Sequence, residues 1–326
     1  MSEAFVVASC SATFGIFNDG PVKRLTDAGC EVRLNPWGRP MSSREILEHA
    51  DGAQAIILGN DRLDASTIDK LSDLRLIARH GSGFDAIDFD AATRHGIVIT
   101  NTPGANREET ADLTFALILD LARMVTESVT QLKGGVWNKI PGRSLYGKTL
   151  GIIGVGQIGM AVARRAMGFG MDIIGNDIVQ RDEAARLGLL YTSLNDLLSR
   201  SDIISIHAPL TSATRNLIGA RELRRMKDGV LLVNTARAGI VRKEALENAL
   251  KSGKVGGYAV DVYENEPPEL DGVWQLPNVL TTPHIGSATF EANQRMGDIV
   301  VDNILAFKDG YDPPNRVTAV DRVRFS

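Results

Sequence analysis

Three residues with side chains suited to proton transfer or anion binding lie in the second half of the sequence. They are Arg237, Glu266 and His284, and each comes shortly after an apolar run. Side chains that follow strands are candidates for chemistry, because open α/β sheets bind ligands at the carboxyl ends of their strands. Histidine can act as a general acid or base near neutral pH, and a carboxylate on its other ring nitrogen would fix its tautomer and favour its charged form. An arginine can hold a carboxylate or polarise a carbonyl, so the three predict a site that interconverts a secondary alcohol and a ketone.

A glycine-rich loop near the middle of the chain is typical of dinucleotide binding. It reads Gly154-Val155-Gly156-Gln157-Ile158-Gly159, after an apolar run that predicts a strand and before a run that predicts a helix. Gly154 would permit the tight turn, Gly156 the approach of a pyrophosphate, and Gly159 close packing of helix on strand. The N–H groups at the start of the helix would bind the phosphates.

An acidic residue follows the loop at the interval expected for ribose binding. Asp177 ends a second predicted strand, 172–176, about twenty residues after the loop. A carboxylate there accepts hydrogen bonds from ribose hydroxyls and repels a 2′-phosphate, which favours NAD over NADP as the cofactor. The alternative is that Asp177 only caps a turn.

Each of the three reactive residues also has a plainer interpretation when taken alone. Arg237 is typical of a surface ion pair, Glu266 of a solvated loop, and His284 of the end of a strand. Their position after a dinucleotide-binding motif favours the catalytic interpretation.

The composition excludes several other classes of protein. The chain has 326 residues, 44% of them apolar, and a net charge of −4 with no dense run of Lys or Arg, so nucleic acid is not an expected partner. The only cysteines are Cys10 and Cys30, and no His, Cys or carboxylate spacing indicates a metal. The N-terminus lacks a signal pattern and no apolar run reaches a membrane span, so we expect a cytoplasmic protein that binds no membrane.

The chain alternates predicted strands and helices in two series, which predicts two α/β domains with parallel sheets. Between the series, Glu108 to Lys133 is predicted as one helix, buried nearly all round, that connects the domains. A last helix is predicted from Thr289 to Phe307. The predicted strands are 5–8, 31–34, 55–58, 74–78, 96–100, 149–153, 172–176, 202–206, 230–233 and 258–260, and a further apolar run, 279–283, precedes His284.

These motifs, in this order, resemble the NAD-dependent D-2-hydroxyacid dehydrogenases, in the branch similar to phosphoglycerate dehydrogenase. The resemblance spans nearly the whole chain. It is carried by Gly81–Asp88, Asn101–Asn106, the glycine loop, His207–Thr211, Asn234–Arg237, Asp261–Pro267 and Pro283–Gly286.

The resemblance implies the architecture and the assembly. A Rossmann NAD-binding domain, residues 104–287, would be inserted into a flavodoxin-like catalytic domain, residues 1–103 and 288–326. A homodimer through the NAD-binding domains would be expected, with the arm near Trp137. We expect no serine-feedback control of the kind that C-terminal regulatory domains give longer relatives.

The resemblance also implies residue roles. Arg237, Glu266 and His284 would be catalytic, and the backbone around Ser82 and Gly83 would bind the substrate carboxylate together with Arg237 and His284. A turn flanked by glycines exposes N–H groups that form such an anion site. The implied NAD-binding residues are Gly154, Gly156, Gln157, Ile158, Gly159, Asp177, His207, Pro209, Thr235, Ala236, Asp261 (at the nicotinamide carboxamide) and Gly286.

The substrate stays open at this point. The loop Gly59–Arg62 lacks the clustered arginines that some phosphoglycerate dehydrogenases offer to a phosphate, although Arg62 or Arg79 could serve. The expected reaction is hydride transfer between NAD and C2 of a D-2-hydroxy acid or 2-oxo acid; D-3-phosphoglycerate dehydrogenase is the first candidate activity and hydroxypyruvate or glyoxylate reductase is the alternative. A protein that only senses NAD, like the corepressors that share this fold, is the alternative from another class.

Overall fold

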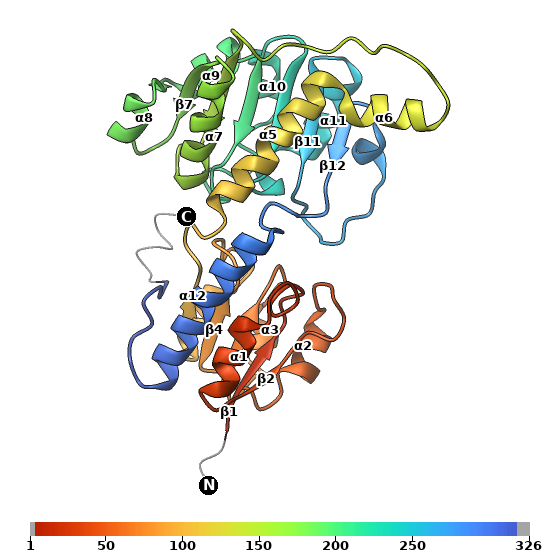
Figure 1. Ribbon diagram of the computed structural model, residues 1–326. Coiled ribbons are helices and arrows are strands. Elements are labelled where there is room, and N and C mark those ends of the chain that lie inside the picture. Colours follow the sequence, from red (N-terminus) through yellow and green to blue (C-terminus); the bar gives the residue numbers. More distant parts are fainter. Residues whose placement is uncertain (1–3, 318–326) are drawn as a thin grey trace. The chain divides into compact units, whose positions relative to one another are not determined.

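The computed structural model describes residues 4–317 (Figure 1), which divide into two compact units. One unit contains the described residues up to Asn106 and from Ser287 onward, and the other contains Arg107–Gly286. Residues 1–3, at which we looked for a signal, lie outside the described residues. So does 318–326, the end of the predicted catalytic domain.

The first unit is built on a five-stranded parallel sheet in the order β2-β1-β3-β4-β5. This is the strand order of flavodoxin-like folds, and the prediction of that fold is confirmed. Its strands are β1 (Phe5–Ser9), β2 (Cys30–Arg33), β3 (Ala55–Leu58), β4 (Leu76–Arg79) and β5 (Val98–Thr100). Its helices are α1 (Gly20–Asp27), α2 (Ser43–His49), α3 (Ala65–Ile68), α4 (Phe89–Arg94) and α12 (Phe290–Lys308).

Helices cover both faces of this sheet because alternate residues of each strand point to opposite sides. In β3, Ala55 and Ile57 pack with α1 and α12, whereas Ile56 and Leu58 pack with α2, α3 and α4. The strands therefore read as continuous apolar runs, as expected for a parallel sheet buried on both faces.

The second unit is built on a seven-stranded parallel sheet in the order β12-β11-β10-β9-β6-β7-β8. Strand order reverses between β6 and β9, as in a Rossmann fold, and the prediction of that fold is confirmed. Its strands are β6 (Thr149–Ile153), β7 (Asp172–Asn176), β8 (Leu190–Tyr191), β9 (Ile203–Ile206), β10 (Val230–Asn234), β11 (Val255–Val260) and β12 (Val279–Thr281).

Two layers of helices enclose this sheet. On one face α5 and α7 pack against side chains such as Leu150 and Leu231, and on the other α9, α10 and α11 pack against side chains such as Ile204 and Leu232. The helices of the unit are α5 (Arg107–Arg123), α6 (Val125–Lys133), α7 (Gln157–Gly168), α8 (Asp182–Arg186), α9 (Leu194–Arg200), α10 (Ala220–Arg225) and α11 (Lys243–Lys251), with 3₁₀ turns at Ala238–Ile240 and Gly272–Gln275.

The predicted single helix over 108–133 is wrong. The helix is interrupted at Met124, whose φ of 55° is left-handed, so α5 ends at Arg123 and α6 begins at Val125. α5 belongs to the core of the second unit, but no residue of α6 is buried. The two-residue strand β8 was also not predicted.

No helix within residues 4–317 is both long and apolar enough to cross a membrane.

Candidate active site

His284 and Glu266 form a close pair at the carboxyl end of the seven-stranded sheet. Nδ1 of His284 lies 2.7 Å from Oε1 and 2.8 Å from Oε2 of Glu266. Burial tends to raise the pKa of Glu266, but the hydrogen bond and charge of His284 outweigh it and hold that pKa below its ordinary value. The tautomer is fixed by this contact, since Nδ1 faces the carboxylate and Nε2 is the nitrogen directed elsewhere.

The backbone at His284 has a left-handed conformation that is uncommon for residues other than glycine. Its φ is 54°. Asp261, which directly follows β11, holds the residues on either side of His284. Its Oδ1 accepts hydrogen bonds from Thr282 Oγ1 (2.7 Å) and Ile285 N (2.8 Å), and its Oδ2 accepts one from Gly286 N (2.8 Å). The buried carboxylate thus fixes the loop that presents the imidazole, and burial raises the pKa of Asp261.

Arg237 lies in the loop that follows β10. Asn234, the last residue of that strand, shapes the loop by accepting from Ala236 N (3.0 Å) and donating to Arg237 O (2.9 Å). The guanidinium donates to Ala236 O (2.7 Å), and its charge helps to lower the pKa of Glu266. The three predicted catalytic residues therefore lie at the carboxyl ends of β10, β11 and β12, which are neighbours in the sheet.

The glycine loop has the geometry that a dinucleotide pyrophosphate needs. Gly154 has a φ of +91° and a side chain there would strike the backbone at His207 and Ala208. At Gly159 a Cβ would lie 2.2 Å from Gly154 O, so α7 packs directly on the turn. A Cβ at Gly156 would meet nothing within 4 Å, which leaves open space beside the N-terminus of α7, formed by Gln157 and Ile158.

A surface hollow lies at this helix start. Its lining includes Arg181 and Arg164, and Arg164 lies two turns along α7 and pairs with Glu108 (3.0 Å) and Glu183 (3.6 Å). The free N–H groups and positive dipole at the helix start suit an anionic group. The other lining residues are Arg107, Gly156, Gln157, Met160 and Glu183.

Asp177 lies at the end of β7 and accepts two backbone hydrogen bonds. One comes from Val155 N in the glycine loop (2.6 Å) and the other from Val179 N (2.9 Å). Asp177 therefore does cap a turn, and it also holds the glycine loop. A carboxylate has about four lone-pair sites, so these two bonds leave acceptor capacity for ribose hydroxyls.

His207 and Pro209 follow β9, next to the point where the strand order reverses. His207 Nε2 is 2.7 Å from Ser205 Oγ, whereas its buried Nδ1 has no hydrogen-bond partner among the described residues. Burial lowers the pKa of His207 to about 3, so the ring is neutral near pH 7. Pro209, two residues after His207, is exposed.

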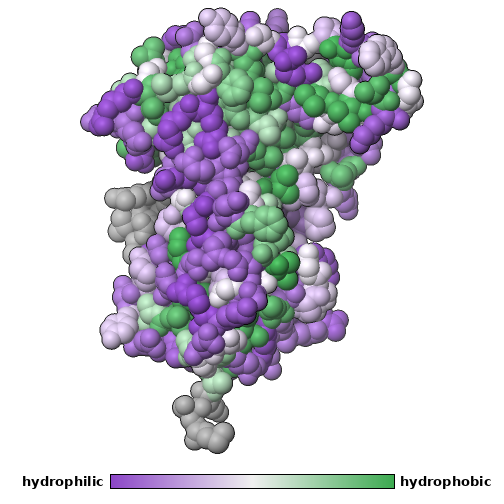
Figure 2. Space-filling view, in the orientation of Figure 1, coloured by the Kyte–Doolittle hydropathy of each residue, from purple (hydrophilic) through white to green (hydrophobic). Residues whose placement is uncertain are grey.

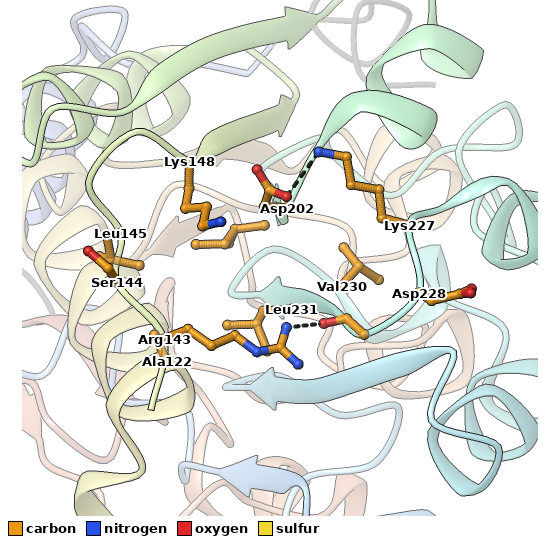
Figure 3. A pocket seen from close by; sticks show the side chains of 12 residues that line it. Ala122, Arg143, Ser144, Leu145, Lys148, Asp202, Lys227, Asp228, Val230 and Leu231 are labelled. Atoms are coloured by element: carbon orange, nitrogen blue, oxygen red, sulfur yellow. Dashed lines mark hydrogen bonds and ion pairs between the residues drawn. The ribbon is translucent and has the colours of Figure 1, made fainter. Parts of the chain in front are cut away.

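A second hollow, in Figure 3, lies at the opposite edge of the same sheet. It is formed at the amino ends of β6, β9 and β10, where Lys227 pairs with Asp202 (2.9 Å) and Arg143 donates to Gly229 O. Ligands of open α/β sheets bind at the carboxyl ends instead, and we do not assign this hollow to the chemistry.

In the first unit, Ser82 and Gly83 lie in the loop after β4. Ser82 is fixed by its neighbours, since its hydroxyl donates to Thr102 O (3.0 Å) and its carbonyl accepts from Asn101 Nδ2 (2.7 Å). Within the described part of the chain, no hydrogen bond uses the backbone N–H of Ser82 or Gly83. Two such N–H groups are what an anion site requires.

Arg79, which we considered as a phosphate ligand, is directed into its own unit. It is only 8% exposed, and its guanidinium donates to Leu58 O (3.2 Å), His80 O (2.7 Å) and Asn60 Oδ1 (3.1 Å). It thereby joins the loops after β3 and β4. The exposed Arg62 is the remaining arginine of the pair that we named.

Sequence reasoning missed two threonines of α5 that contact the predicted cofactor-binding residues. Thr110 Oγ1 donates to Gly286 O (3.1 Å), and Thr114 Oγ1 lies 2.9 Å from Thr235 Oγ1. The available signal was a pair of hydroxyl residues four apart on an otherwise apolar helix face. Among the described residues, no group of three or more His, Cys, Asp or Glu side chains could hold a metal ion.

The chain matches the family model described as D-isomer specific 2-hydroxyacid dehydrogenase, NAD binding domain, over residues 115–286. It is 43% identical to a glyoxylate reductase of Korarchaeum cryptofilum, over 91% of this chain and 93% of that protein. It is 40% identical to a D-3-phosphoglycerate dehydrogenase of Archaeoglobus fulgidus, over 89% of this chain but 55% of that protein. Among solved structures it resembles a glyoxylate reductase from Paecilomyes thermophila, with a TM-score of 0.84 and 33% identity over 97% of this chain and 99% of that one.

Proposed function

The chain belongs to the D-isomer specific 2-hydroxyacid dehydrogenases, which are NAD-dependent oxidoreductases, and we propose that it reduces a small 2-oxo acid, with glyoxylate as the first candidate. The relative named glyoxylate reductase supports this choice because it matches over nearly its whole length. The internal hydrogen bonds of Arg79 also favour a substrate without a phosphate. Phosphohydroxypyruvate is the second candidate, on the 40% identity to a phosphoglycerate dehydrogenase.

His284 is the proposed general acid for reduction and the general base for oxidation. Nδ1 stays hydrogen-bonded to Glu266, and Nε2 exchanges a proton with the oxygen on C2 of the substrate. Glu266 holds the ring through Nδ1, and Asp261 keeps the left-handed backbone of His284 in place. The His284–Glu266 distance of 2.7 Å is the observation that carries the proposal.

Arg237 and the loop at Ser82 and Gly83 are the proposed anion-binding elements. The guanidinium of Arg237 binds the substrate carboxylate or polarises the carbonyl at C2 through its planar set of donors. The backbone N–H groups of Ser82 and Gly83 bind the carboxylate.

The glycine loop, with Gln157 and Ile158, is the proposed site of the NAD pyrophosphate, and Asp177 that of the adenine-side ribose. NADH, when bound, supplies the hydride that reduces C2. The nicotinamide would be oriented by Asp261, Thr235, Ala236 and Gly286. The remaining proposed NAD-binding residues are His207 and Pro209.

The proposed assembly is a cytoplasmic homodimer joined through the second unit. Val125, Val129 and Leu132 of α6 are all exposed, at 49%, 45% and 56%, and apolar atoms gather over this part of the surface in Figure 2. Trp137, four residues after the end of α6, is 82% exposed. Free, buried thiols at Cys10 and Cys30 are compatible with a reducing compartment.

The test replaces the proposed acid and a matched histidine. We expect His284→Gln to lower kcat for NADH-dependent glyoxylate reduction by about a hundred- to ten-thousandfold. His95→Gln is the control, because His95 also contacts a carboxylate (Asp69, 2.8 Å) but lies on the surface of the first unit.

Two results would contradict the proposal. Near-normal turnover in His284→Gln would exclude its role. Tight NADH binding by the wild-type protein, with no oxidation of NADH across a panel of 2-oxo acids, would favour an NAD-sensing protein instead.

A further inference from the structure

Helix α5 contributes two buried threonines to the loops that carry the proposed reactive residues. Thr110 is 4% exposed and Thr114 is fully buried. Thr110 contacts Gly286, two residues after His284, and Thr114 contacts Thr235, two residues before Arg237. One helix face therefore supports both loops.

The hydrogen-bond directions in this cluster follow from counting protons. Thr114 Oγ1 donates its single hydrogen to Thr110 O, at 2.7 Å. In its contact with Thr235 Oγ1 it must then be the acceptor, so Thr235 is the donor. The hydroxyl hydrogen of Thr235 points toward α5, and only the lone pairs of its oxygen are left for another partner.

Thr235 is suited to meet a ligand. It is 8% exposed, follows the last residue of β10 at the carboxyl edge of the sheet, and lies in the loop that carries Arg237. A hydroxyl whose hydrogen is already committed can only accept from a ligand. NAD offers matching donors in its carboxamide N–H₂ and ribose hydroxyl groups.

We propose that Thr114 is a positioning residue for cofactor binding, which fixes the hydroxyl of Thr235 as an acceptor for a donor group of NAD. This inference rests on the proposed function, since it takes NAD as the ligand of the loop. Thr110 has a parallel task, because its bond to Gly286 O ties the start of α5 to the last residue of the unit.

The experiment measures the dissociation constant of NADH by calorimetry and kcat by NADH oxidation. We expect Thr114→Val to raise the Kd about five- to twentyfold, as for the loss of one buried hydrogen bond, and to change kcat less than threefold. Thr114→Ser keeps the hydroxyl and should stay within twofold of wild type. Thr93→Val is the matched control, because Thr93 also donates to the carbonyl four residues earlier (2.7 Å) but is exposed in the first unit.

A double-mutant cycle separates positioning from general damage. Thr235→Val should raise the Kd about as much as Thr114→Val, and the double variant should lose no more than either single one, because Thr114 acts through Thr235. Multiplying losses, or an unchanged Kd in Thr114→Val, would overturn the proposal. Should Thr114→Val fail to fold, Thr235→Val and Thr235→Ser decide, with equal affinities in the two counting against it.

The same data distinguish this inference from the proposed function. A wild-type protein that binds NADH without oxidising it with any 2-oxo acid refutes the reductase activity, while the binding cycle still tests Thr114. Normal turnover by the wild-type protein, together with a Kd for NADH that Thr114→Val leaves unchanged, refutes the role of Thr114 and leaves the proposed function intact.

Discussion

Three carboxylates of the second unit accept hydrogen bonds from the backbone N–H groups of loops that we assign to cofactor or substrate. Glu266 accepts from Tyr263 N, Asp261 from Ile285 N and Gly286 N, and Asp177 from Val155 N. Sequence motifs indicated these acids as ligands or catalytic partners. Their structural bonds could not be predicted, since they depend on loop conformations that no local pattern specifies.

The double contact of Asp177 leads to a prediction at the residue scale. Asp177→Ala should weaken NADH binding and relax the exclusion of NADPH, because it removes both the ribose acceptor and the charge that repels a 2′-phosphate. Steady-state kinetics with both cofactors check this. Asp177→Asn, which keeps an acceptor for Val155 N but loses the charge, is the control for the loop. An unchanged preference in both variants would count against the ribose role.

His80 predicts a pH dependence of stability. It is buried after β4, with Nδ1 3.2 Å from Ser11 Oγ, and burial followed by the charge of Arg79 lowers its pKa to about 4. The unfolded chain, with a histidine pKa near 6.5, binds more protons between these values. The stability that the neutral form of His80 contributes is therefore fully present above pH 6.5. It is lost as the pH falls toward 4, and the loss from this group is roughly 3 kcal/mol.

Urea unfolding of wild type and His80→Asn at pH 7 and pH 4.5 measures this effect. The variant should lose less stability between the two pH values than the wild type does. His95→Asn, at an exposed site, serves as control. Parallel losses in wild type and His80→Asn would show that His80 is not the responsible group.

At the scale of elements, strands were easier to predict than helix ends. Ala55–Leu58 and Asp172–Asn176 have the predicted bounds, because short β-branched runs between turn residues specify buried strands. The break at Met124 was missed since neither glycine nor proline marks it. The threonines of α5 were missed because their partners, Thr235 and Gly286, lie more than a hundred residues away in the sequence.

The glycine loop and α7 give a prediction that separates folding from binding. Gly156→Ala has space for its Cβ, so the unfolding temperature should hardly change, whereas NADH binding should fall at least tenfold because the methyl group enters the proposed pyrophosphate position. Gly159→Ala would place its Cβ against backbone, at Gly154 O, and should destabilise the protein by a few kcal/mol. Thermal unfolding and NADH titration check both. Equal stability losses in the two variants would refute this division of roles.

At the scale of the whole molecule, the order of motifs specified the architecture better than composition could. The alternating strands and helices predicted two α/β domains, and the resemblance to the D-2-hydroxyacid dehydrogenases implied that one domain is inserted in the other. Each unit has its own sheet, covered on both faces by helices. Composition alone allowed either one large core or two ordinary ones.

The exposed face of α6 carries the prediction for assembly. A nine-residue helix with no buried residue is marginally stable in water by itself, and we propose that a second copy of the chain covers Val125, Val129 and Leu132. Leu132→Asp would bury a charge in that contact and should convert a wild-type dimer to monomer, as measured by sedimentation or light scattering. Thr130→Asp, on the other side of the helix, should leave the dimer intact. A monomeric wild-type protein, or a Leu132→Asp variant with the mass of a dimer, would exclude α6 as the interface.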